Sequence, residues 1–197
     1  MSSPVSSQRS LGHVRRNLSP ELPSHTKSVE RWLTDMVGRL RELSIPGAIT
    51  RARLPGMVVE EYARFKKRSN SEHEYLIAKI RCPDGKPRFI RLERTVKLES
   101  QKDLGSIRHV ASTIKQVSNL VLGNLPAEDT VTLVSGMPTD SEDERIESKT
   151  PQNPITLLDL AIIAHCVHED SKNYNLLKRQ CFWFGATISC LLEKNGG

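Results

Sequence analysis

The sequence predicts an α+β domain in which a small antiparallel sheet packs with one N-terminal helix and two C-terminal helices. Three observations predict it: helical apolar spacing in residues 27–43, two alternating segments joined by a turn in residues 73–96, and two apolar helical segments after residue 153. Residues 1–25 are rich in Ser, Pro and Arg, and we expect a disordered tail there. Residues 26–195 are expected to form a single domain.

The first helix is predicted from apolar residues that recur every three or four positions in residues 27–43. Ser28 or Thr26 is placed to cap its start, and Pro46-Gly47 ends it. Residues 57–65 fit either a strand or a short helix.

The clearest strand signal is a hairpin. Residues 73–82 and 87–96 have strand patterns, and the intervening Pro-Asp-Gly-Lys of residues 83–86 is a strong turn sequence. A further helix is predicted at residues 107–122 and a short strand at residues 130–134.

The C-terminal part begins with an acidic segment at about residues 135–153, which we expect to be a mobile surface loop. A mostly buried helix follows, with Pro154 in its first turn. A polar connector at residues 168–180 then leads into a second apolar helix that starts at Cys181.

Composition narrows the classes of function. Lys and Arg outnumber Asp and Glu by 29 to 23, but these charges are scattered, and no aromatic residues interleave the Lys66-Lys67-Arg68 run. Nucleic-acid binding is therefore not indicated. No apolar run approaches the roughly 20 residues that span a bilayer, and no secretory leader is evident. We expect an intracellular protein, cytoplasmic or nuclear, with reduced thiols.

Metal and cofactor binding are not predicted. His165, Cys166 and His168 stand close together in the sequence, but no second ligand pair at zinc spacing completes a site. We expect these to be ordinary helix residues near a C-terminus, where an imidazole suits the helix dipole.

Cys181 has two interpretations. A polar segment runs directly into it and an aromatic-rich helix starts there, so helix N–H groups would favour its thiolate. The same arrangement also suits a structural cysteine buried under Phe182, Trp183 and Phe184.

Residues 174–184, Tyr-Asn-Leu-Leu-Lys-Arg-Gln-Cys-Phe-Trp-Phe, resemble the Y-x-L-L-x-x-N-C-x-x-F signature of circularly permuted papain-like thiol enzymes. These include the PPPDE peptidases and, more distantly, the lecithin:retinol acyltransferase group. Over about residues 27–195 the chain also resembles uncharacterised proteins of mushroom-forming fungi, with an H-E-[FY] strand, an I-R-L-E-R strand and a C-[FWY]-W-F helix. In the permuted order the histidine precedes the cysteine helix, and His73 has that place.

The resemblance implies a cysteine hydrolase or acyl transferase that acts on a peptide, isopeptide or other acyl bond. Cys181 would be the nucleophile and His73 the general base. Glu93 is the candidate third member, because the partner strand of the hairpin brings it near His73. The backbone N–H of Cys181 and the side-chain amide of Gln180, which replaces the family's Asn, are candidate oxyanion donors. The alternative is a non-catalytic protein-interaction module of the same fold.

Overall fold

The computed structural model describes Leu22 and residues 25–43, 56–68, 73–96, 125–139, 141–175 and 180–196. Over these ranges the chain has three helices and a seven-stranded antiparallel sheet, which confirms the predicted α+β class. The elements are β1 (Lys27–Ser28), α1 (Val29–Leu43), β2 (Val58–Lys67), β3 (Glu74–Arg81), β4 (Arg88–Val96), β5 (Leu125–Val134), β6 (Asp143–Lys149), α3 (Leu157–Asp170), β7 (Asn173–Tyr174) and α4 (Cys181–Gly196). Among the described residues, no helix combines the length and apolar character needed to cross a membrane.

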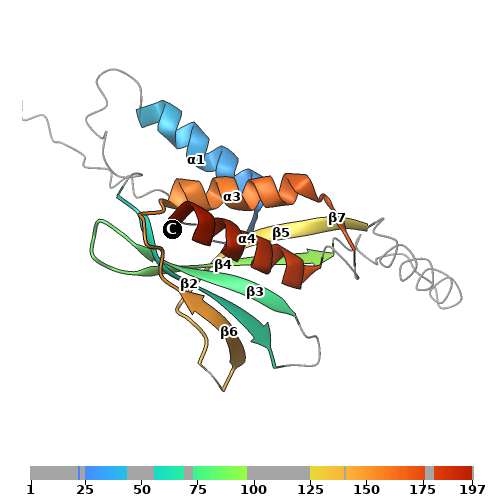
Figure 1. The fold of residues 1–197 in the computed structure, drawn as a ribbon. Helices are drawn as coiled ribbons and strands as arrows, with labels where there is room; N and C mark the ends of the chain where they lie inside the picture. The colour runs from blue at the N-terminus through green and yellow to red at the C-terminus, as the bar shows by residue number, and fades with distance from the viewer. Residues whose placement is uncertain are drawn as a thin grey trace, which may run out of the picture.

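The strands follow the order β1-β5-β4-β3-β2-β6, with β7 beside β5. Figure 1 shows α1, α3 and α4 together over one face of this sheet. The predicted hairpin is formed by β3 and β4, which pair with Tyr75 opposite Glu93 and Ala78 opposite Ile90. Its turn contains Gly85 at a φ of 73°, a left-handed conformation that glycine adopts without steric cost.

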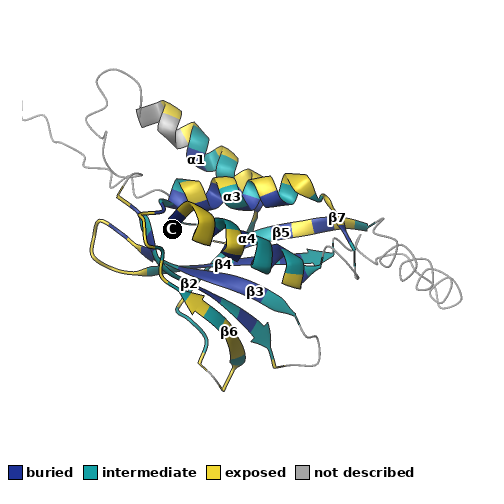
Figure 2. Ribbon diagram, viewed as in Figure 1, coloured by how far each residue is buried: buried dark blue, intermediate teal, exposed yellow. Residues whose placement is uncertain are grey.

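Alternation along the strands makes two different faces. On the helix face, strand side chains form the main core with residues from all three helices: Leu76, Ala78, Ile80, Ile90 and Leu92 with Trp32, Leu160 and Phe184. On the opposite face, which we call the outer face, a smaller buried cluster consists of Ala63, Phe65, Tyr75 and Ile77. Strand β3 is therefore buried on both sides (Figure 2).

The helices begin near the predicted positions. The helix expected from Pro154 starts instead at Leu157, because Thr156 and Asp159 form a capping box. The Asp159 N–H donates to Thr156 Oγ1 at 3.1 Å, and the Thr156 N–H donates to Asp159 Oδ2 at 2.8 Å. Helix α4 starts at Cys181, as predicted.

The acidic segment of residues 135–153 is not a loop throughout. Its residues Asp143–Lys149 form β6, which pairs with β2 at the edge of the sheet. Lys66 stands opposite Glu144 in this pairing, so part of the acidic charge faces the basic end of a strand that is distant in the sequence. Of residues 57–65, which fitted a strand or a helix, all but Met57 belong to the strand β2.

Two further expectations concern residues that the structure does not describe. The predicted helix at residues 107–122 lies outside the described ranges, as does most of the predicted tail at residues 1–25.

Arg94 of β4 and Asp129 of β5 form a buried ion pair at the start of α4. Arg94 Nε and Nη2 donate to the two carboxylate oxygens of Asp129 at 2.7 and 2.6 Å, and both side chains are closed to solvent. The guanidinium carbon lies 5.0 Å from the ring centres of Trp183 and Phe184. This bidentate pair therefore ties the first turn of α4 to the centre of the sheet.

The same ion pair holds the end of α3. Arg94 Nη2 also donates to the Ser171 carbonyl at 2.9 Å, and His168 Nδ1 lies 2.8 Å from Asp129 Oδ2. His168 is thus part of a structural cluster that joins two strands and two helices.

Replacing Asp129→Asn should lower the free energy of unfolding by about 3–5 kcal/mol, because the Arg94 charge would stay buried without its counter-ion. Urea denaturation followed by circular dichroism measures this. Glu169→Gln is the matched control, since it removes a negative charge from an exposed ion pair with Lys172. It should leave the urea concentration at the midpoint of unfolding almost unchanged. Equal midpoints for the two variants would contradict the structural role of the cluster.

Candidate active site

Cys181 is the first residue of α4, and its sulfur lies against backbone N–H groups. The Phe184 N–H donates to the Gln180 carbonyl at 3.1 Å, so Gln180 occupies the position before the helix. The Glu74 N–H donates to Cys181 Sγ at 3.5 Å, and the Phe182 N–H is directed to the same sulfur. Only 9% of Cys181 is exposed. The sulfur is therefore partly desolvated and lies where positive ends of peptide dipoles converge.

His73 lies directly before β3 and bridges Cys181 and Glu93. Its backbone carbonyl accepts a hydrogen bond from the Lys67 N–H at 2.9 Å, which holds it beside the end of β2. The imidazole also interacts with the Cys181 thiol, an interaction that raises the pKa of His73 and lowers the pKa of Cys181. Its Nε2 lies 2.9 Å from Glu93 Oε2, so Nδ1 is the ring nitrogen left for the sulfur. The structure thus brings the three residues together.

The Glu93 position follows from the hairpin register. Glu93 stands opposite Tyr75, two residues beyond His73, so its side chain reaches the end of β3 at which the imidazole lies. The side chains of His73 and Glu93 are 15% and 20% exposed, which leaves this hydrogen bond only partly screened by water.

The pKa shifts favour a thiolate and an imidazolium. Burial raises the pKa of the Cys181 thiol, but the hydrogen bonds from His73 and the Glu74 N–H outweigh it and lower the pKa overall. Hydrogen bonds to Cys181 and then to Glu93 raise the pKa of His73 to about 9. Burial likewise raises the pKa of Glu93, but His73 and Arg91 outweigh it, so this carboxyl stays ionised at neutral pH.

Arg91 supports Glu93 from the same strand. Its Nη2 donates to Glu93 Oε2 at 2.6 Å, and its guanidinium carbon lies 3.9 Å from the Tyr75 ring centre. Sequence reasoning missed Arg91. The available signal was its position two residues before Glu93, which places both side chains on one face of a strand.

Tyr174 is a second residue that sequence reasoning did not assign. It belongs to β7, which pairs with β5, and its hydroxyl interacts with the thiol and the backbone of Cys181, as the shift in its pKa indicates. Burial and the nearby Cys181 charge raise the pKa of Tyr174 to about 12, so the phenol keeps its proton. The signal was available in the Tyr-x-Leu-Leu sequence that precedes Cys181.

Gln180 lies beside Cys181, as the chain requires, and is half-buried. The structure uses its backbone carbonyl in the first turn of α4. The role of its side-chain amide as an oxyanion donor stays a prediction.

The other three cysteines differ from Cys181. Cys82 is buried in the core, where burial raises the pKa of its thiol, whereas Cys166 and Cys190 are exposed. Within the described ranges, no group of three or more His, Cys, Asp or Glu side chains is arranged to hold a metal ion.

Comparison of the chain with protein-family models, with curated proteins and with solved structures gives no match.

Cys181 should react with iodoacetamide at neutral pH well ahead of Cys82, Cys166 and Cys190, because the thiolate is the reactive form. His73→Ala should slow the reaction of Cys181, while the control His25→Ala should not. Peptide mapping by mass spectrometry gives the rate at each cysteine. Faster labelling of the exposed Cys166 or Cys190 than of Cys181 would contradict an activated thiol.

His73 should titrate near pH 9, because its pKa is raised from 6.5 to about 9. The imidazolium is then fully present below pH 6.5 and is lost as the pH rises through about 9. Cys181→Ala removes the first cause of the shift, so the midpoint should move to lower pH. The control Cys190→Ala should leave it unchanged. Histidine ring resonances followed by NMR measure these midpoints. A wild-type midpoint at or below 6.5 would exclude the ion pair.

Proposed function

We propose that the protein is a cysteine hydrolase or acyl transferase of the permuted papain-like type, acting through Cys181 and His73. The observation that carries the proposal is the position of the His73 imidazole, which interacts with the Cys181 thiol and is hydrogen-bonded to Glu93. A nucleophile, a base and a group that orients the base are the parts that thiol acyl transfer requires. The histidine also precedes the cysteine helix in the chain, as in the permuted order.

In the acylation step, the Cys181 thiolate attacks the carbonyl carbon of the substrate and forms a tetrahedral oxyanion. The imidazolium of His73 then gives its proton to the leaving amine or alcohol, whose bond to the carbonyl carbon breaks. The products are a thioester on Cys181, the released leaving group and a neutral His73. Glu93 keeps the imidazole in the orientation that serves this transfer.

In the second step, neutral His73 takes a proton from water or from an acceptor amine or alcohol, which attacks the thioester. The C–S bond breaks and Cys181 leaves as a thiolate beside the restored imidazolium. Water as the acceptor gives hydrolysis, and another nucleophile gives acyl transfer.

Two donors suit the developing oxyanion. The backbone N–H of Cys181 opens α4, and the Tyr174 hydroxyl lies within hydrogen-bonding reach of that N–H. Since the phenol is protonated at neutral pH, it is able to donate a hydrogen bond to the oxyanion. The Gln180 amide is the third candidate, from its place next to the nucleophile.

The substrate is proposed to be a peptide, isopeptide or other acyl compound. Phe182 follows Cys181 and is 49% exposed, which is unusual for an aromatic side chain in this chain. The Arg64 guanidinium carbon lies 5.5 Å from its ring centre. This exposed aromatic side chain, adjacent to Cys181 in the chain, is a suitable contact for the substrate.

Incubation with p-nitrophenyl acetate should give a burst of nitrophenolate and one acetyl group on Cys181, visible by intact mass and removed by hydroxylamine. Cys181→Ala should abolish the burst. His73→Ala should slow it by about 10²-fold or more, since the thiolate and its base are both affected. Tyr174→Phe should slow it by about 10²-fold, because the variant lacks the hydroxyl proposed to stabilise the oxyanion.

Cys190→Ala is the matched control for this experiment, because it removes an exposed thiol from the same helix and should preserve the burst. Acetylation spread equally over Cys166, Cys181 and Cys190 would overturn the enzymatic proposal. The non-catalytic protein-interaction module would then be the remaining function.

A further inference from the structure

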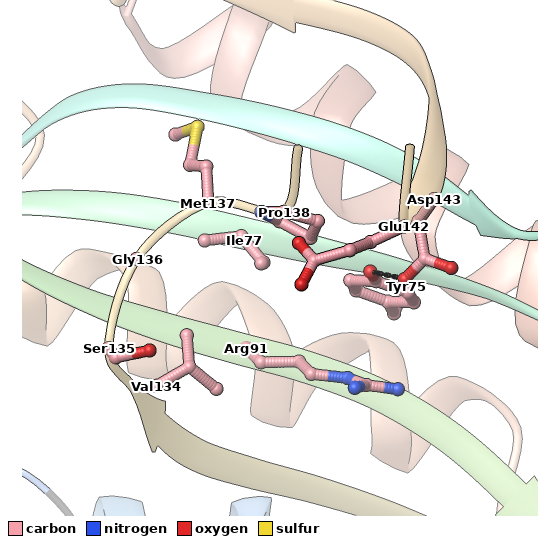
Figure 3. Close-up of a pocket in the computed structure, with 10 residues that line it drawn as sticks. All are labelled: Tyr75, Ile77, Arg91, Val134, Ser135, Gly136, Met137, Pro138, Glu142 and Asp143. Carbon is pink, nitrogen blue, oxygen red and sulfur yellow. Dashed lines mark hydrogen bonds between the residues drawn. The ribbon is translucent and has the colours of Figure 1, made fainter. Parts of the chain in front are cut away.

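A pocket of about 370 Å³ lies on the outer face of the sheet, opposite the helices. Tyr75, Ile77 and Arg91 form its floor, and their strand neighbours Leu76 and Leu92 point into the helix-face core. The wall consists of residues 135–138, which follow β5, and Glu142, which precedes β6 (Figure 3). The volume falls within the range of about 300–1,000 Å³ that ligand pockets have.

One side of the pocket is apolar and the other is acidic. Ile77, Val134, Met137 and Pro138 supply the apolar side. Figure 3 shows the Glu142 carboxylate extending over the floor, with Asp143 beside Tyr75.

Both carboxylates are held in place by hydrogen bonds. Glu142 Oε2 accepts from the Thr139 N–H at 2.9 Å and from Thr139 Oγ1 at 3.2 Å. Asp143 accepts a hydrogen bond from the Tyr75 hydroxyl. A ligand would therefore meet a preorganised acidic end, which lowers the cost of binding.

Arg91 does not cancel this acidic character, because its own charge is matched nearby. Its Nη2 lies 2.6 Å from Glu93 Oε2, and its guanidinium stacks over the Tyr75 ring. Glu142 and Asp143 are thus left in excess in the pocket, so an anionic ligand is disfavoured and a cationic one favoured.

We infer that this pocket binds the lysine or arginine side chain of an extended polypeptide. The aliphatic part of such a side chain fits against Ile77, Val134 and Met137, while its charged end reaches Glu142. The inference goes beyond the proposed function, because the pocket lies on the other face of the sheet from α4 and binding there requires no thiol. Arg91 nevertheless connects the pocket to Glu93, so an occupant would lie next to the group that orients His73.

The test uses the full chain carrying Cys181→Ala, in which the proposed chemistry is removed and only binding is measured. Four fluorescein-labelled pentapeptides differ at the central position alone: Lys, Arg, norleucine or Glu. Fluorescence anisotropy gives the four dissociation constants. The dissociation constants of the Lys and Arg peptides should be at least about fivefold lower than that of the norleucine peptide, because only these two peptides place a positive charge at Glu142. The Glu peptide should bind most weakly.

The double variant Cys181→Ala/Glu142→Gln should bind the Lys peptide no more tightly than the norleucine peptide. The amide keeps an acceptor for Thr139, so the loop is preserved. Glu144→Gln is the matched control, since Glu144 is exposed nearby on β6 and does not line the pocket. Equal affinities for Lys and norleucine, no measurable binding, or equal effects of the two Glu→Gln changes would overturn the inference. None of these outcomes bears on acylation of Cys181, so failure of one proposal is distinguishable from failure of the other.

Discussion

Arg94 and Asp129 meet in the core at the start of α4, where neither side chain reaches solvent. Such a pair is stable only when both charges are also hydrogen-bonded, and here the carboxylate accepts two bonds from Arg94 and a third contact from His168. The pair joins the central strands to both C-terminal helices. Because strand residues alternate, the adjacent Glu93 points to the outer face, where it meets His73. One segment of β4 therefore holds the cysteine helix through Arg94 and the His73 imidazole through Glu93.

The candidate site is a row of charges of alternating sign. Arg91 is next to Glu93, Glu93 next to His73, and His73 next to the Cys181 sulfur. Partial burial raises the pKa of both Glu93 and Cys181. The adjacent cations and hydrogen-bond donors outweigh this effect, so the pKa of each group is lowered overall. The backbone N–H of Glu74 adds a further stabilising contact at the sulfur. A structural cysteine would have no need of these partners, and the buried Cys82, whose pKa burial raises, is the contrasting case in the same chain.

The outer face relates the two proposals. Arg91 and Tyr75 belong both to the support of Glu93 and to the floor of the pocket. A basic side chain bound at Glu142 would lie beside these residues without approaching α4. In the proposed enzyme this arrangement separates recognition of a polypeptide from the chemistry at Cys181, while leaving a path of direct contacts between them.

The sequence alone determined the elements whose patterns are local. Apolar spacing was sufficient for α1 and for the start of α4 at Cys181, and the turn at Gly85 defined a hairpin whose register brings Glu93 toward His73. Only the tertiary structure decided which distant segments meet. Strand β6 lies in an acidic segment whose pairing partner is far away in the chain, and Tyr174 reaches the sulfur because β7 adds to β5. Asp129 and Arg91 were likewise undistinguished charges until the fold placed them. The physical reason is that periodicity reports which face of an element is buried, whereas long-range pairing depends on free energies summed over the whole chain.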